Sequence, residues 1–262
     1  MKIGFLGAGA MGGAIITGAL KSQIVSPDEV YISDFSRAIT DKYKEMGCNI
    51  VSSNKELGES VDILQVAVKP QYAESALKDL GDSMDGKAMI SIMAGLTTDS
   101  IREMTGGNFR LLRLMPNTPA LVGEGMTAAV IGELVTEDEK NKALEILGSF
   151  GQVEVVSEHI MDAVVAVSGS SPAYVFMLIE AMADGAVADG MPRAQAYKFA
   201  SQAVLGSARM ALELGRHPGE LKDMVCSPAG TTIEAVRVLE KKGFRSAIIE
   251  AEKACADVNR RL

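Results

Sequence analysis

Short apolar runs alternate with amphipathic stretches through residues 1–157 of the chain. Runs with the length and composition of β-strands occur at residues 2–6, 30–33, 61–68, 88–93, 110–115, 126–131 and 153–156. Helix-like stretches lie between several of them, at residues 10–21, 37–46, 71–80, 98–104 and 137–150. Strands that alternate with helices predict βαβ units and a mostly parallel sheet.

The alternation ends near Ser157, and residues 158–262 predict helices without a convincing strand. Prolines stand near three of the predicted helix starts and glycines near three of the ends, at Pro172, Pro192, Pro218, Gly190, Gly215 and Gly243. The chain is therefore predicted to hold an α/β domain at 1–157 and an all-α domain at 158–262. The first two helices of the all-α domain have few polar positions, so we expect this domain to be buried against another subunit.

A glycine-rich turn, GAGAMG, follows the first predicted strand and opens the first predicted helix. In this pattern Gly7 permits a tight turn, Gly9 lets a diphosphate approach the backbone, and Gly12 lets helix and strand pack closely. The start of the helix then offers N–H groups to the negative phosphates. Because the turn belongs to the first strand of a βαβ series, it predicts a Rossmann-type dinucleotide-binding domain.

The end of the second predicted strand contains two signals that disagree about the cofactor. Asp34 favours NAD, because a carboxylate accepts hydrogen bonds from the free 2′-hydroxyl of its ribose. Ser36 and Arg37 favour NADP, because they can hold the 2′-phosphate, Arg37 by charge and bidentate hydrogen bonds. An exposed residue in the first turn of a helix is nearly as good an interpretation of Arg37, and the choice stays open.

Three further loops follow predicted strands at Lys69–Pro70, Ala94–Gly95 and Asn117–Thr118. The carboxyl ends of parallel strands share one edge of the sheet, where such sheets bind ligands. Pro116 and Pro119 fix the third loop, whose amide and hydroxyl groups are available to a ligand. We therefore expect Asn117 to lie at the cofactor, although a rigid turn alone also explains the two prolines.

The stretch CSPAGTTIEAV contains a second candidate site in the all-α domain. Its loop offers successive backbone N–H groups and three hydroxyls, those of Ser227, Thr231 and Thr232, ahead of a predicted helix. Such a loop suits a carboxylate without needing Lys or Arg. Ordinary helix capping by Thr231 or Thr232 explains the same residues equally well.

Composition excludes several classes of protein. The chain of 262 residues has a net charge of −8, which disfavours a nucleic-acid partner. Its three cysteines have no paired spacing, so neither a disulfide framework nor a cysteine zinc site is expected, and the compartment is predicted to be reducing. We expect no signal peptide and no membrane span, because an N-terminal signal pattern and a long uninterrupted apolar run are both missing.

Residues for other chemistries are sparse. The only histidines, His159 and His217, are expected to have structural roles, and we expect no metal site and no serine nucleophile. A hydroxyacid dehydrogenase of similar shape usually needs a lysine on its long central helix, but no lysine occurs between Ile160 and Tyr197. A non-catalytic nicotinamide-binding sensor is the other alternative, and the predicted carboxylate loop argues against it.

The chain resembles the pyrroline-5-carboxylate reductase family along essentially its whole length. The motifs that carry the resemblance are, in order, GFLGAGAMGGAI, AVKP, RLMPNTP, DAVVAVSGSSPAY, SPAGTTIEAVRVLE and FRSAIIEA. The resemblance implies reduction of 1-pyrroline-5-carboxylate to L-proline with NADPH or NADH, the final step of proline synthesis. It also implies a homodimer with a swapped all-helical dimerisation domain, often built into a larger ring of dimers. The predicted reducing compartment is taken to be the cytoplasm.

The resemblance also implies roles for individual residues. The cofactor would be held by Leu6, Gly7, Ala8, Gly9, Ala10, Met11, Asn54, Ala67, Val68, Lys69, Pro70, Ile92, Met93 and Ala94. The substrate would lie at Glu158, Thr231 and Thr232, with its carboxylate near Ser227 and Gly230. Ser171 and Ala229 depart from the family pattern, which usually has glycine at both positions. Thr232 is the expected catalytic residue, because its hydroxyl can hydrogen-bond the ring nitrogen.

Overall fold

The computed structural model describes residues 1–106 and 108–261, which form two compact units. The first comprises Met1–Gly169 with the C-terminal residues from Cys255 onward, and the second comprises Ser170–Ala254. These units do not divide at the predicted boundary after residue 157. The cause is packing within the first unit, where Met161 is 1% exposed and the Nδ2 amide of Asn259 donates to the Asp162 carboxylate at 2.8 Å.

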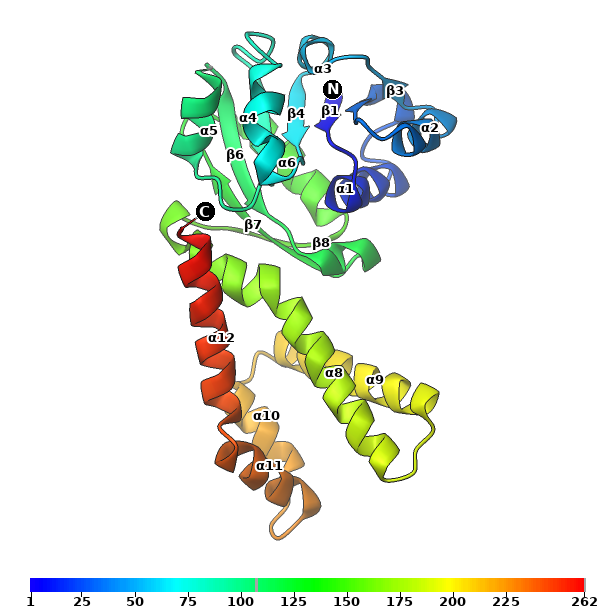
Figure 1. Cartoon of the computed structure of the whole chain (residues 1–262), viewed down its shortest axis with the longest axis vertical. Coiled ribbons are helices and arrows are strands. Elements are labelled where there is room, and N and C mark those ends of the chain that lie inside the picture. The colour runs from blue at the N-terminus through cyan, green and yellow to red at the C-terminus, as the bar shows by residue number, and fades with distance from the viewer. Residues whose placement is uncertain (107, 262) are drawn as a thin grey trace. The chain divides into compact units, whose positions relative to one another are not determined.

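The first unit is built on a single sheet of eight strands in the order β3-β2-β1-β4-β5-β6-β7-β8 (Figure 1). The strands are β1 (Ile3–Leu6), β2 (Val30–Ser33), β3 (Asn49–Ile50), β4 (Ile63–Val66), β5 (Ala88–Ser91), β6 (Arg110–Met115), β7 (Gly125–Ile131) and β8 (Gly151–Val155). Neighbouring strands are parallel throughout, except that β7 is antiparallel to β6. The predicted α/β fold with a mostly parallel sheet is confirmed.

Helices cover both faces of this sheet. They are α1 (Ala10–Lys21), α2 (Arg37–Glu45), α3 (Asn54–Ser60), α4 (Pro70–Lys78), α5 (Thr98–Thr105) and α6 (Glu137–Gly148). One core joins the sheet to α1, α2 and α6 through residues such as Ile15, Tyr43 and Ile146. A second core joins it to α3, α4 and α5 through residues such as Leu57 and Leu77. The sheet is therefore packed between two layers of helices.

An ion pair fixes α6 to strand β6. The Arg110 guanidinium donates to the Glu139 carboxylate, with Nη2 and Oε1 2.5 Å apart. Burial raises the pKa of Glu139, but hydrogen bonds from Arg110 and Thr136 outweigh burial, so the pKa lies below its ordinary value. Glu139 also completes a capping box with Thr136 at the start of α6.

All of the regular structure among the described residues of the second unit is helical. After the short helix α7 (Met161–Val164) and a π-helix at Val165–Ser170, the chain forms α8 (Ser171–Ala188), α9 (Arg193–Leu214), α10 (Pro218–Val225), α11 (Thr231–Lys241) and α12 (Phe244–Asn259). The predicted helix boundaries at Pro192 and Gly215 are confirmed. Pro192 is the N-cap residue of α9, and Gly215 ends the helix with a φ of 59°. Many large apolar side chains on these helices stay exposed within the chain, including Phe199 at 67% and Leu212 at 83%.

Sequence reasoning missed two elements between β2 and β4. Strand β3 has only two residues, which is too short for a periodic pattern. Helix α3 has seven residues, and its one clear signal is Ser53, whose hydroxyl accepts a hydrogen bond from the N–H of Glu56. Predicted strand 61–68 was too long, because the regular pairing of β4 stops at Val66.

One helical stretch of the described chain, Glu158–Ala188, is long and apolar enough to cross a membrane by length and composition alone. Its mean hydropathy is 1.4, and 11% of its most apolar window is buried within the chain. A helix that pairs with another subunit has the same properties, so this finding by itself is weak evidence for a membrane.

We predict that the buried side chain of Gln65 lowers the free energy of unfolding. It lies on β4 between Phe5 and Ile90, is 2% exposed, and has no hydrogen-bond partner for Nε2 among the described residues. Replacing a buried unsatisfied amide with an apolar group of similar size removes that cost, so Gln65→Met should raise the free energy of unfolding by about 1 kcal/mol in urea denaturation. The exposed Gln152→Met is the control and should change it by less than about 0.5 kcal/mol. A loss of stability in Gln65→Met would contradict the assignment.

Candidate functional site

The glycine turn between β1 and α1 leaves no room for side chains at two of its three glycines. Gly7 has a φ of 92°, and its N–H donates to the Ser33 carbonyl at 2.9 Å. A Cβ atom at Gly7 would lie 2.9 Å from the Ala67 carbonyl oxygen, and one at Gly12 would lie 2.3 Å from the Gly7 carbonyl oxygen. The turn is therefore packed against the ends of β2 and β4, as the G-x-G-x-x-G pattern predicts.

Gly9 is different, because it faces open space. A Cβ atom there would meet nothing within 4 Å. Gly9 is the N-cap of α1 and provides no side-chain cap. Since the first N–H groups of a helix have no partner within the helix, the start of α1 offers donors beside an open backbone surface. That surface suits a diphosphate.

Acidic residues are missing from the helix starts that surround this turn. Helices α1, α2 and α4 follow three adjacent strands, β1, β2 and β4, and none has a side-chain cap or an acidic residue in its first turn. Helices α3, α5 and α6 each begin with a capping side chain and at least one acidic residue. In a chain with net charge −8 this difference keeps one part of the carboxyl edge favourable to anions.

Asp34 holds the glycine turn and the following loop together. Its Oδ2 atom accepts a hydrogen bond from the N–H of Ala8, and its Oδ1 atom accepts one from the N–H of Ser36, both at 2.8 Å. Both carboxylate oxygens are thus used by the protein. Ser36 is the N-cap of α2, and the exposed Arg37 is its first residue.

Asn54 lies at the same edge and connects β2 to α4. Its Oδ1 atom accepts a hydrogen bond from the Ser33 hydroxyl at 2.9 Å, and its Nδ2 amide donates to the Ala76 carbonyl at 3.4 Å. Ser33 is the last residue of β2 and directly precedes Asp34. The structure therefore brings Asn54 to the end of β2, near Asp34.

The ends of β4 and β5 supply the other predicted cofactor residues. The N–H of Ala67 donates to the Leu6 carbonyl at 2.8 Å, which places the end of β4 beside the glycine turn. Val68 and Lys69 follow, and Pro70 begins α4. The N–H of Ile92 donates to the Val66 carbonyl at 3.1 Å, so Ile92, Met93 and Ala94 continue along the same edge. Met11 lies in the first turn of α1.

Asn117 uses its side chain inside the protein. Its Nδ2 amide donates to the carbonyl and hydroxyl of Ser168, and its Oδ1 atom accepts the N–H of Met126 at 2.9 Å. It therefore fixes the loop after β6 against β7 and the π-helix. Its role at a cofactor stays a prediction.

Glu158 belongs to a cluster that sequence reasoning did not find. Arg113, in the middle of β6 and 6% exposed, donates through Nη1 to Glu158 Oε1. The Thr98 hydroxyl donates to Glu158 Oε2 at 3.1 Å. A charged residue within the apolar strand sequence RLLRLM was the one available signal, since a buried arginine requires a partner.

The second predicted site lies on its own in the helical unit, at the loop before α11. Gly230 is the N-cap of α11 without any side-chain cap, and Thr231 and Thr232 are the first residues of the helix. The interpretation of these threonines as caps is therefore wrong. The Gly230 N–H donates to the Ser227 carbonyl at 3.0 Å, and a Cβ at Gly230 would lie 2.3 Å from the Ser227 hydroxyl oxygen.

Ala229 carries backbone strain in the same loop. Its φ is 56°, in the left-handed region that L-residues with a Cβ atom avoid. This departure from the glycine usual in the resembling family therefore has a physical cost. The loop nevertheless keeps its turn, with the N–H groups at the start of α11 uncapped.

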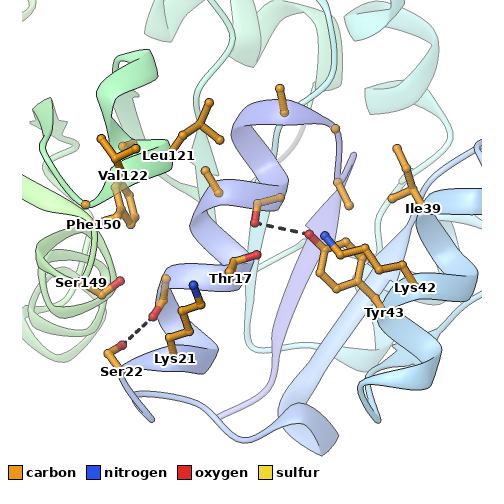
Figure 2. Close-up of a pocket in the computed structure, with 18 residues that line it drawn as sticks. Thr17, Lys21, Ser22, Ile39, Lys42, Tyr43, Leu121, Val122, Ser149 and Phe150 are labelled. Atoms are coloured by element: carbon orange, nitrogen blue, oxygen red, sulfur yellow. Dashed lines mark hydrogen bonds between the residues drawn. The ribbon is translucent and has the colours of Figure 1, made fainter. Parts of the chain in front are cut away.

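A groove of about 790 Å³ runs along the outer side of α1 (Figure 2). Figure 2 shows Leu121, Val122 and Phe150 on one side of the helix, and Lys42 and Tyr43 on the other. At one end the groove reaches the glycine turn. Its remaining walls contain none of the residues predicted to bind the cofactor, so most of the groove lies apart from the predicted site.

Two family models match different parts of the chain. Residues 2–95 match the model described as NADP oxidoreductase coenzyme F420-dependent. Residues 158–262 match the model described as pyrroline-5-carboxylate reductase dimerisation, which supports the formation of an oligomer.

Individual relatives match the whole length. The chain is 50% identical to the pyrroline-5-carboxylate reductase of Escherichia coli (strain K12), over 100% of this chain and 98% of that protein. It is 44% identical to the enzyme of the same name from Methanosarcina acetivorans, over 95% of this chain and 93% of that protein. A crystal structure of Plasmodium falciparum pyrroline carboxylate reductase with NADP bound has a TM-score of 0.91 at 32% identity, covering 100% of this chain and 97% of that one.

Alanine at Gly9 should weaken dinucleotide binding, whereas alanine at Gly12 should lower the stability of the fold. Gly9→Ala places a methyl group in open space, so the free energy of unfolding should change by less than about 1 kcal/mol, while a dinucleotide binds at least about tenfold more weakly because the diphosphate loses its close approach. Gly12→Ala forces the methyl group onto the Gly7 carbonyl oxygen and should destabilise the domain by more than about 2 kcal/mol. Thermal unfolding and calorimetric titration measure both effects. Equal stability losses in the two variants would show that the turn is wrongly described.

Proposed function

Because the chain belongs to the pyrroline-5-carboxylate reductase family, we propose that it reduces the C=N bond of 1-pyrroline-5-carboxylate with NADPH to give L-proline. This reaction is the last step of proline synthesis. The observation that carries the proposal is the presence of two helix starts without side-chain caps in one chain. One is the glycine turn at Gly9, which suits a diphosphate, and the other is the loop at Gly230, which suits a carboxylate.

The glycine turn and the ends of β2, β4 and β5 are proposed to hold the cofactor, which supplies a hydride from its nicotinamide when bound. The diphosphate lies on the turn from Leu6 to Met11, where Gly9 leaves the space and α1 supplies N–H groups. Ser36 and Arg37 hold the 2′-phosphate. NADPH is favoured over NADH because Ser36 and the exposed Arg37 can hold a 2′-phosphate, Arg37 by charge and bidentate hydrogen bonds.

The loop before α11 is proposed to hold the substrate, a flat ring that carries a carboxylate. Ser227, Gly230 and Thr231 present hydroxyl and backbone N–H groups for the carboxylate. Thr232 hydrogen-bonds the ring nitrogen. Glu158 is proposed as a further substrate residue, and its own carboxylate accepts hydrogen bonds from Arg113 and Thr98.

The reaction asks little acid–base chemistry of the protein. The protonated C=N group is already electrophilic, and its carbon accepts the hydride while the nitrogen keeps its proton and becomes an amine. The residues named above therefore act by aligning the two reacting carbons and excluding water, and most of the rate gain comes from positioning.

The assembly is proposed to be a homodimer that can build a larger ring of dimers. Residues 1–157 bind the cofactor, and residues 158–262 form the dimer and carry the substrate loop. The support is the apolar surface of α8 and α9, where Phe176, Met177 and Phe199 are 62%, 67% and 67% exposed within one chain. Large apolar side chains exposed together on two neighbouring helices are typical of a surface that another protein subunit covers. The protein is proposed to be cytoplasmic, and its three cysteines without paired spacing support a reducing compartment.

The direct test is an assay of the purified protein in which the loss of NADPH absorbance measures the oxidation of NADPH. Oxidation is expected only when 1-pyrroline-5-carboxylate is present, with one L-proline formed for each NADPH consumed. NADH in place of NADPH should give a lower kcat/KM. Failure with both cofactors across neutral pH would refute the proposed reaction.

Thr232→Ala is expected to lower kcat by about tenfold or more, because one hydrogen bond to the charged ring nitrogen is lost. Thr232→Ser keeps the hydroxyl and should retain most of the activity. Since the threonine lies at the substrate in this proposal, the Kd of NADPH should stay within about twofold in both variants. Steady-state kinetics and calorimetric titration provide the two readouts. A matching loss of NADPH affinity in Thr232→Ala would place the residue at the cofactor instead.

A further inference from the structure

Phe35 has an exposure that its own chain does not explain. It stands between Asp34 and Ser36 in the loop from β2 to α2 and is 97% exposed, more than any other large apolar residue of the described chain. From residue 2 to residue 45, no other large apolar side chain in that described part is exposed. A patch suited to a protein partner would be wider than this single ring, so what the ring can bind follows from its place in the fold.

The loop that carries Phe35 is held in place on both sides. On one side Asp34 accepts the N–H groups of Ala8 and Ser36 at 2.8 Å. On the other side the Ser36 carbonyl accepts the N–H groups of Ile39 and Thr40, at 3.0 and 3.1 Å, as α2 begins. The backbone on both sides of Phe35 is therefore held in place, while the ring extends into solvent.

The Asp34 carboxylate also connects this loop to the glycine turn, through its hydrogen bond from the N–H of Ala8. Phe35 therefore lies where β2 ends, at the same edge of the sheet as the glycine turn. A dinucleotide whose diphosphate rests on the turn extends its adenosine toward the end of β2. The adenine is the large flat apolar part of that half of the ligand.

We propose that Phe35 is the stacking platform for the adenine of the dinucleotide. Base–aromatic stacking removes one face of each ring from water and does not depend on the 2′-phosphate. Phe35 therefore contributes equally to NADPH and NADH binding, and Ser36 and Arg37 distinguish them. The inference rests on the proposed function only in taking the ligand to be an adenine dinucleotide.

The chain contains no tryptophan, which permits a direct test with Phe35→Trp. Adenosine 2′,5′-bisphosphate, which has no nicotinamide, should quench the emission of this single indole in a saturable titration. The control is Leu134→Trp, at a residue 65% exposed that follows the antiparallel strand β7 and so lies at the opposite edge of the sheet. Its emission should not change. An unchanged emission in Phe35→Trp at nucleotide concentrations that saturate the wild type would overturn the proposal.

Calorimetric titration of Phe35→Ala gives a second, independent readout. Its Kd should rise about tenfold for NADPH and for NADH alike, equivalent to about 1.4 kcal/mol and typical of one stacked base. Phe35→Tyr keeps the ring and should stay within about twofold of the wild type. Binding of reduced nicotinamide mononucleotide, which lacks adenine, should not weaken. An unchanged Kd in Phe35→Ala, or an equal loss for the mononucleotide, would refute the stacking role.

Neither titration contains 1-pyrroline-5-carboxylate. A failed reductase assay would therefore leave both results standing, and a failed stacking test would leave the proposed reaction standing.

Discussion

The close contact between Gly12 and the carbonyl oxygen of Gly7 is the constraint on which the site depends. The distance of 2.3 Å that a Cβ would have to this oxygen means that only glycine lets α1 approach β1 so closely. This approach places the start of α1 directly at the end of the strand. The N–H groups of the helix and the open backbone at Gly9 then face the same region, and the rest of the proposed cofactor site is arranged around them.

Charge follows this geometry. The protein is acidic overall, yet the starts of the three helices that follow β1, β2 and β4 lack acidic residues and side-chain caps. The one carboxylate among them, Asp34, has both oxygens directed to backbone N–H groups. An acidic side chain thus stabilises the loop around the site and at the same time holds Phe35 in place for the proposed contact with adenine.

Much of this organisation could be predicted from the sequence. The helix over residues 10–21, the strands over 30–33 and 110–115, and the helix ends at Pro192 and Gly215 match the structure, because apolar periodicity and the backbone limits of proline and glycine act locally. The glycine turn was equally predictable, because its spacing reports one local geometry.

Long-range pairing could not be predicted in the same way. The contacts of Asp34 to Ala8 and Ser36 depend on how two loops meet, which no local pattern reports. The partners of Glu158 lie 45 and 60 residues away, at Arg113 and Thr98. The boundary near residue 157 marks a change of local pattern, whereas the packing of Met161 into the first unit depends on the folded core.

The central claim is that this chain brings a reduced nicotinamide directly to the imine carbon of its substrate. Incubation with 1-pyrroline-5-carboxylate and NADPH that carries deuterium at the transferable position of its nicotinamide C4 tests this claim. Mass spectrometry should then find the deuterium on the ring carbon of L-proline that was part of the C=N bond, with none lost to water. Proline without deuterium, or no proline, would contradict the account.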